Sequence, residues 1–235
     1  MKEISMDFFR DEVRNGFFIP TAVKQAWAAQ LQVLDVIETI CRKHDITYFA
    51  DWGTILGTVR HGGYVPWDDD MDICMKREDY TRFKEAAKTE LPKDFRIHDY
   101  EHQEDHWLFL SRVANSVHIN FEPEHMKQFH NFPYIAGIDI FVLDYLYKDE
   151  QQEKQRCEEV KHIIAVADSI IAGEIAQPVK EANLIQLEEK YHKTFNRKLD
   201  NRHIGIELYR LAEEQMARVP EEQSDRMAQI FPLGL

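Results

Sequence analysis

The chain has 235 residues, of which 44% are hydrophobic, and its formal net charge is −13. This length and apolar content suffice for a core of enzyme size. The negative charge argues against binding to nucleic acid or to an anionic membrane, because both would repel the protein. No apolar stretch is long enough to span a bilayer, and the first 20 residues mix acids with aromatics, unlike a signal peptide. We therefore expect a cytoplasmic protein without a transmembrane segment.

The expected elements alternate between helix and strand in the first part of the chain and become helical after residue 150. Apolar residues at helical spacing predict a helix over Pro20–Lys43, and a β-branched and aromatic run predicts a strand over Ile46–Phe49. The remaining expected elements are a helix over Arg77–Thr89, strands over Asp94–His98, Trp107–Val113 and Ile138–Leu143, and helices over Glu150–Gly173, Val179–Leu199 and Ile204–Arg218.

A dense cluster of acidic residues follows Pro66-Trp67. It consists of four carboxylates within five residues, Asp68, Asp69, Asp70 and Asp72. Like charges this close raise one another's energy, so the cluster predicts a bound divalent cation. If the segment is a strand, Asp70 and Asp72 leave the same face, while Met71 and Ile73 point into a core. An acidic surface turn is the alternative interpretation.

Two other ligand-binding loops do not fit this segment. In an EF-hand-like series that starts at Asp68, position 6 would be Ile73, where the turn needs glycine, and position 12 would be the short Asp79. A P-loop does not fit either, because the segment from Gly53 to Gly57 is followed by Thr-Val-Arg and not by Gly-Lys-Ser/Thr.

A further carboxylate, Asp139, lies inside an apolar run that is typical of a mostly buried strand. An unpaired carboxylate there would cost several kcal/mol, so Asp139 should be protonated, salt-bridged or metal-bound. We expect a role as metal ligand or base in phosphoryl transfer. The alternative is a structural ion pair with an arginine.

Arg60 and His61 lie in a segment that we expect to be a loop between Gly53 and the acid cluster. A guanidinium can hold a phosphate through two hydrogen bonds, which makes Arg60 a candidate phosphate ligand. Its alternative is a salt bridge to a neighbouring aspartate. His61 is a second candidate at the phosphate, with a hydrogen-bonding turn residue as its alternative.

Residues 51–80, with the sequence "DWGTILGTVRHGGYVPWDDDMDICMKREDY", closely resemble the core motif of the LicD family. These are phosphocholine transferases of bacterial cell-surface polysaccharides, related to the fukutin-like ribitol-phosphate transferases. The resemblance extends to "CRKHDITYFA" before the motif and to "GIDIFVLDYL" after it. It implies an α+β fold with a nucleotidyltransferase-like mixed β-sheet flanked by helices. With the helical pattern after residue 150, we expect residues 1–150 to form this catalytic core and residues 151–235 a helical extension packed on it, the two together making one compact unit.

The resemblance also implies roles for single residues. Gly53 and Thr54 match the family's turn that holds the donor phosphates, Asp70 and Asp72 match its metal-binding pair, and Asp139 matches the third acid of the metal and catalytic site. Arg112 takes the basic position of a family strand and is a candidate phosphate or nucleotide contact. Two departures are present: Ala114-Asn115 follows that strand where an aspartate is usual, and the family's aromatic C-terminal segment is not found before Leu235.

The implied activity is magnesium-dependent transfer of a phospho-alcohol group, phosphocholine above all, with manganese as the alternative metal. The donor would be a CDP-alcohol or another nucleotide, and the acceptor a hydroxyl of a glycan or teichoic acid precursor, which the protein would reach by peripheral contact if that precursor is lipid-linked. CMP would leave. The alternatives are a nucleotidyltransferase that releases pyrophosphate and a catalytically silent metal- or glycan-binding homologue.

Overall fold

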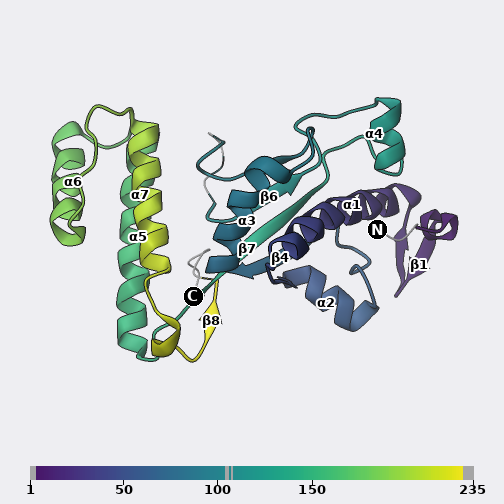
Figure 1. Ribbon diagram of the computed structural model, residues 1–235, viewed down its shortest axis with the longest axis horizontal. Coiled ribbons are helices and arrows are strands. Elements are labelled where there is room, and N and C mark those ends of the chain that lie inside the picture. Colours follow the sequence, from purple (N-terminus) through teal and green to yellow (C-terminus); the bar gives the residue numbers. More distant parts are fainter. Residues whose placement is uncertain (1–3, 104–105, 107, 230–235) are drawn as a thin grey trace. The chain divides into compact units, whose positions relative to one another are not determined.

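The computed structural model describes residues 4–103, 106 and 108–229, and the chain divides into two compact units (Figure 1). The first unit comprises Met1–Asp99 and Leu110–Val142, and the second comprises Tyr100–Phe109 and Leu143–Leu235. One long strand, β7 (Gly137–Tyr145), leads the chain from the first unit into the second.

The first unit is an α+β structure built on a central mixed sheet with the strand order β3-β4-β7-β6-β5. The other strands of this sheet are β3 (Tyr48–Ala50), β4 (Asp72–Lys76), β5 (Arg96–His98) and β6 (Ser111–Ala114). Strand β6 pairs antiparallel with β7 and places Arg112 opposite Asp139. Strand β6 overlaps the end of the predicted strand Trp107–Val113, whose first residue, Trp107, lies outside the described residues.

The helices of the first unit are α1 (Thr21–Lys43), α2 (Trp52–His61), α3 (Arg77–Glu90) and the short α4 (Pro123–Gln128) (Figure 1). Of these, α1 and α3 supply much of the core that packs on the sheet. The predictions of α1 and α3 are confirmed. Both helices carry apolar residues at helical spacing, and the resulting faces meet the sheet in a core that contains the fully buried side chains of Val33, Ile37, Phe83, Ile138 and Ile140.

Helix α2 corrects the prediction of a turn at Gly53-Thr54 and a loop at Arg60-His61. Gly53 and Thr54 lie in the first turn of α2, and Arg60 and His61 lie in its last turn. The helix ends at Gly62, whose φ of 67° is in the left-handed region that favours glycine. The glycine-rich loop is therefore shorter than expected and begins only after His61.

A hairpin that the sequence reading did not include precedes α1. Its strands are β1 (Glu12–Arg14) and β2 (Phe17–Ile19), which pair antiparallel. The two residues between them, Asn15 and Gly16, have φ values of 53° and 80°. An Asn-Gly pair with both residues left-handed is the favoured two-residue connection between antiparallel strands.

The second unit is mainly helical. Its elements are α5 (Glu150–Ala172), α6 (Gln177–Tyr191), α7 (Asn201–Met216), a 3-10 turn at Glu221–Gln223 and the short strand β8 (Met227–Ala228), which pairs with the end of β7. Helix α5 ends at Gly173, as predicted. The prediction of a helix to Leu199 is wrong, because the chain leaves α6 at His192, whose φ is 53°.

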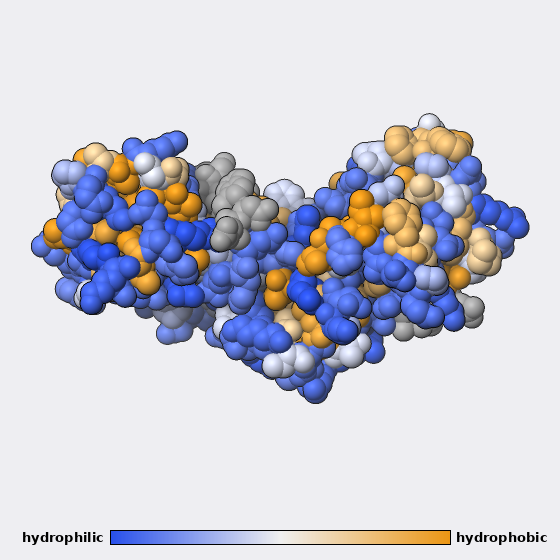
Figure 2. Space-filling model, turned by 90° about the horizontal axis from the view of Figure 1, so that it is seen from above, coloured by the Kyte–Doolittle hydropathy of each residue, from blue (hydrophilic) through white to orange (hydrophobic). Residues whose placement is uncertain are grey.

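Apolar side chains of α5 and α7 form a separate core in this second unit, including Val160, Ile163, Ile170 and Leu208. Hydrophilic residues cover most of the face of each unit that Figure 2 presents, in keeping with the high charge of the chain. Among the described helices, none combines the length and the apolar composition that crossing a membrane requires.

Candidate active site

The three predicted acids, Asp70, Asp72 and Asp139, come together where β4 begins. Asp72 is the first residue of β4, and Asp139 lies on the neighbouring strand β7. The backbone N–H of Asp139 donates to the carbonyl of Met71 at 3.3 Å, which fixes the two strands side by side at this point. Asp70 is exposed in the loop just before β4, while Met71 is buried in the core.

Strand alternation explains why Asp139 can serve a site although its neighbours form the core. Along β7 the residues Ile138, Ile140 and Val142 are buried, and the residues between them are only partly buried. Because successive side chains of a strand point to opposite faces, Asp139 leaves the sheet on the face opposite to these apolar neighbours.

Burial, together with the crowding of the acids, raises the pKa of two of them. Burial raises the pKa of Asp72 to about 7, with further contributions from the charges of Asp70, Asp139, Asp51 and Asp68. Burial, a hydrogen bond with Asp70 and the charges of Asp70 and Asp69 raise the pKa of Asp68 to about 6. A positive ion at this position would relieve the repulsion that both shifts express.

The donor set fits a hard divalent cation such as magnesium. Carboxylate oxygens of Asp68, Asp69 and Asp70 lie within 4.8 Å of one another. Oxygen ligands supplied by one or two carboxylates are what magnesium takes in proteins. Asp70 belongs to this trio and also raises the pKa of Asp72, so it connects the loop carboxylates to the acid that begins β4.

The start of α2 holds the backbone of Asp72 from both sides. The hydroxyl oxygen of Thr54 accepts from the N–H of Asp72 at 2.8 Å, and the N–H of Asp51 donates to the carbonyl of Asp72 at 3.0 Å. A threonine hydroxyl keeps a hydrogen to donate, so this bond is compatible with the predicted contact of Thr54 to a donor phosphate.

Asp51 is a site residue that the sequence reading missed. Its carboxylate accepts from the N–H of Trp52 at 2.9 Å and caps α2. Its charge also contributes to the raised pKa of Asp72. An aspartate directly before a helix is a common N-cap, and this signal was available once Trp52 and the following residues are taken as helical.

Arg112 and Asp139 form an ion pair through two hydrogen bonds. Arg112 Nε donates to Asp139 Oδ1 at 2.6 Å, and Arg112 Nη2 donates to Asp139 Oδ2 at 2.7 Å. This is the ion pair with an arginine that the sequence left open as the alternative role of Asp139. It raises the pKa of Arg112, to which the charges of Asp70 and Asp72 also contribute. Arg112 thus lies within the field of the whole acid cluster.

Arg60 and His61 interact with each other at the end of α2. Arg60 Nε donates to His61 Nε2 at 3.1 Å, and His61 Nδ1 lies 2.9 Å from the side-chain amide nitrogen of Asn15 in the β1–β2 turn. The His61 ring also contacts Trp67 edge to face, with 5.8 Å between the ring centroids. These contacts tie the hairpin, α2 and the loop before the acid cluster together.

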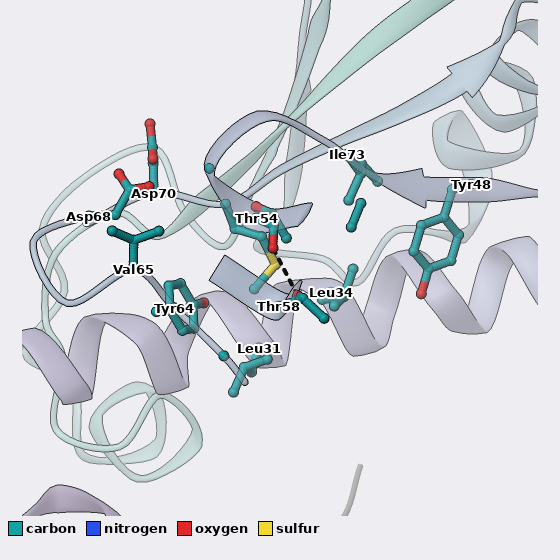
Figure 3. Close-up of a pocket in the computed structure, with 14 residues that line it drawn as sticks. Leu31, Leu34, Tyr48, Thr54, Thr58, Tyr64, Val65, Asp68, Asp70 and Ile73 are labelled. Carbon is teal, nitrogen blue, oxygen red and sulfur yellow. Dashed lines mark hydrogen bonds between the residues drawn. The ribbon is translucent and has the colours of Figure 1, made fainter. Parts of the chain in front are cut away.

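A cavity of about 250 Å³ lies beside the acid cluster (Figure 3). Its wall is mostly apolar and comes from α1, α2, β3, β4 and the loop after α2. In Figure 3, Asp68 and Asp70 lie at one end of the pocket and Tyr48 lies at the other. The hydroxyl of Thr58 donates to the backbone carbonyl of Thr54, and the hydroxyl of Tyr64 donates to the backbone carbonyl of Trp27. Both hydroxyls therefore already have hydrogen-bond partners within the protein.

Two glycines of α2 allow the close packing that forms this pocket. A Cβ atom on Gly53 would come within 2.2 Å of Asp68 Oδ2, and one on Gly57 would come within 2.4 Å of the carbonyl oxygen of Gly63. Real Cβ atoms do not approach other atoms so closely, so the absence of side chains lets α2 contact both the acid loop and the backbone after the helix.

Known proteins resemble this chain in the same region. The family described as "LicD/FKTN/FKRP, nucleotidyltransferase domain" matches residues 45–165. A lipopolysaccharide cholinephosphotransferase, LicD, of Haemophilus influenzae is 43% identical over 53 residues, which cover 23% of this chain and 20% of that protein. An uncharacterized protein of Rickettsia typhi is 39% identical over 54 residues, which cover 23% of this chain and 18% of that protein.

These aligned segments span about a fifth of the length of the curated relatives. The family match is longer and contains α2 as well as the acid loop, β4 and β7, which carry Asp70, Asp72 and Asp139. The chain belongs to the LicD/FKTN/FKRP family of nucleotidyltransferase domains.

Proposed function

We propose that this protein transfers a phospho-alcohol group, phosphocholine above all, from a CDP-activated donor to a hydroxyl of a cell-surface glycan precursor. The meeting of Asp70, Asp72 and Asp139 at one end of the sheet carries this proposal, because phosphoryl transfer depends mainly on position and on neutralised charge. The name of the Haemophilus relative supports phosphocholine as the group transferred.

The acids divide the work as follows. Asp70 and Asp72 bind magnesium, with manganese as its substitute, and Asp139 either completes this site or accepts the proton of the attacking hydroxyl. The metal, when bound, neutralises charge on the phosphate oxygens. Gly53 and Thr54 at the start of α2, together with Arg60, His61 and Arg112, contact the donor phosphates.

The proposed reaction is a single displacement at phosphorus. The acceptor oxygen forms a bond to the phosphorus that carries the alcohol, and the bond from this phosphorus to the oxygen shared with CMP breaks. CMP takes the bonding electrons, and the hydroxyl proton passes to a carboxylate of the site.

The pocket beside the acid cluster supports choline as the alcohol. Its wall is mostly apolar, and its two carboxylates, those of Asp68 and Asp70, lie at one end (Figure 3). A trimethylammonium group presents methyl groups to its surroundings and carries a positive charge. Such a group suits apolar contacts along the wall and attraction to the carboxylates.

The experiment is to supply purified protein with magnesium, a glycan acceptor and either CDP-choline or a nucleoside triphosphate. The proposal expects CMP from CDP-choline, faster with acceptor than without it, and loss of this product in Asp70→Asn. Pyrophosphate from a triphosphate, with no CMP from any CDP-alcohol tested, would assign the protein to the nucleotidyltransferases. If neither product forms while cation binding persists, a silent binding homologue is the better description.

A further inference from the structure

We propose that Arg112 is a built-in counter-cation of the acid cluster that competes with a divalent cation for Asp139. The inference rests on the proposed metal site and goes further, because it predicts that removing a positive side chain strengthens cation binding and that the arginine exchanges partners during the reaction.

The geometry of the pair carries the first step. Both oxygens of Asp139 are engaged, by Arg112 Nε at 2.6 Å and by Arg112 Nη2 at 2.7 Å. Charge-assisted bonds of this two-point kind are among the strongest hydrogen bonds in proteins. Arg112 occupies one lone pair of each oxygen, along the open edge of the carboxylate. A cation that binds Asp139 at this edge must displace at least part of the contact.

The surroundings of the pair carry the second step. Asp139 contributes to the raised pKa of Asp72, and Asp70 and Asp72 contribute to the raised pKa of Arg112, so all four groups interact. Across the β6–β7 register Arg112 stands opposite Asp139. With a divalent cation in the cluster, the positive charge of Arg112 would oppose it at short range.

The exposure of the Arg112 side chain to solvent carries the third step. The side chain of Arg112 is 52% exposed, whereas that of Asp139 is only 17% exposed. Asp139 is fixed on a central strand, while the arginine can swing toward solvent. Once released, its guanidinium offers paired N–H donors to a phosphate, which is the role predicted for Arg112 from the sequence.

Gly137 makes room for the arginine at this position. A Cβ atom on Gly137 would lie 3.0 Å from Arg112 Cδ and 3.1 Å from Arg112 Cγ. These distances are tight, so an alanine would press on the stem of Arg112 without changing any charge. Gly137→Ala is therefore a second way to weaken the Arg112–Asp139 ion pair.

The test measures Mn²⁺ binding to the whole protein without donor or acceptor, by calorimetry and by thermal unfolding with and without Mn²⁺. For Arg112→Gln we expect lower stability without cation and tighter binding of Mn²⁺. The melting temperature without cation falls, because Asp139 loses its partner among other acids. The dissociation constant for Mn²⁺ also falls, by about tenfold, because the competing pair is gone.

The matched control is Arg82→Gln. Arg82 pairs with Asp79 at 3.1 Å, and the two side chains are 52% and 16% exposed, almost the same as in the Arg112–Asp139 pair. This change removes an equally exposed ion pair outside the acid cluster, so Mn²⁺ binding should stay at the wild-type level. Gly137→Ala should shift Mn²⁺ affinity in the same direction as Arg112→Gln, by a smaller factor.

The outcomes separate this inference from the proposed function. Equal or weaker Mn²⁺ binding by Arg112→Gln, with normal binding by the wild type, would overturn the competition and leave the metal site in place. If neither protein binds Mn²⁺, the metal site of the proposed function fails and the competition fails with it. Binding by Arg112→Gln alone would support the competition in its strongest form.

Discussion

Thr54 and Asp72 are joined by a hydrogen bond of 2.8 Å from the backbone N–H of Asp72 to the hydroxyl oxygen of Thr54. This bond links the first turn of α2 to the first residue of β4, and hence the predicted phosphate-binding residues to the predicted metal-binding pair. The bond holds the backbone of Asp72 in place and leaves its carboxylate available for a ligand.

We predict that Thr54→Val weakens the site and that Thr54→Ser preserves it. Valine keeps the shape of threonine but leaves the N–H of Asp72 without this acceptor. The cost of an unsatisfied, partly buried donor is about 1–3 kcal/mol. The melting temperature of Thr54→Val should fall by several degrees and its CMP production should fall as well, measured side by side with Thr54→Ser. Equal behaviour of the two variants would contradict a role for the hydroxyl.

Asp70→Asn and Asp72→Asn should each reduce activity by at least about 100-fold, because an amide does not replace a charged metal ligand. They should also reduce the rise in melting temperature that magnesium produces in the wild type, since that rise reflects binding to the folded state. Circular dichroism should give wild-type helix content for both. Near-normal turnover with an unchanged magnesium response would show that the metal binds elsewhere.

Asp139→Asn should leave the protein folded and lower turnover by orders of magnitude. Asparagine keeps the size of the side chain and can still accept a bond from Arg112, but it loses the charge needed for a ligand or a base. Turnover and the free energy of unfolding are measured on the same preparation. A variant that is destabilised yet fully active would mean that Asp139 serves only the ion pair with Arg112.

Without divalent cation, the stability of the wild type should contain a part that falls as pH rises. The pKa of Asp72 is about 7 in the folded protein against an ordinary 3.8, so the folded state binds more protons than the unfolded state between these values. Its contribution is therefore complete below about pH 4 and lost by about pH 7. Melting temperatures in EDTA from pH 4 to pH 8 measure this dependence.

Asp72→Asn is the comparison that isolates this contribution, because asparagine does not titrate. The difference in stability between the wild type and this variant should change steadily across that pH range. A constant difference would mean that the pKa of Asp72 is not raised in the folded protein.

Helices with long apolar periodicity could be predicted well from the sequence. The start of α1 at Thr21 and the end of α5 at Gly173 follow from Pro20, from the capping glycine and from apolar residues three and four positions apart. Strand β7 was equally clear from its β-branched run. These signals are local, and no distant contact overrides them.

Helix α2 was missed because its glycines have a packing function. Gly53 and Gly57 suggested a turn, yet both are helical and are small because Asp68 and Gly63 approach them closely. That approach depends on tertiary structure. A helical signal was nevertheless present in Trp52, Ile55, Leu56 and Val59, which share the spacing of one helix face.

Two other features differ in how far the sequence predicts them. The β1–β2 hairpin could have been predicted from Asn15-Gly16, the strongest short-range signal for such a connection. The pairing of Arg112 with Asp139 could be named only as one alternative, since it depends on the register of β6 on β7. A shift of that register by one residue would turn Arg112 to the other face of the sheet.

The pocket of Figure 3 has a practical consequence for chemical inhibition. The hydroxyls of Thr58 and Tyr64 are bonded to the protein, and the carboxylates of Asp68 and Asp70 lie at one end. Most of the wall is apolar, so a compound that carries hydrogen-bonding groups along its length would lose their hydration in this cavity and find partners for few of them. Screening should therefore favour short molecules with a single cationic end and an otherwise hydrocarbon body.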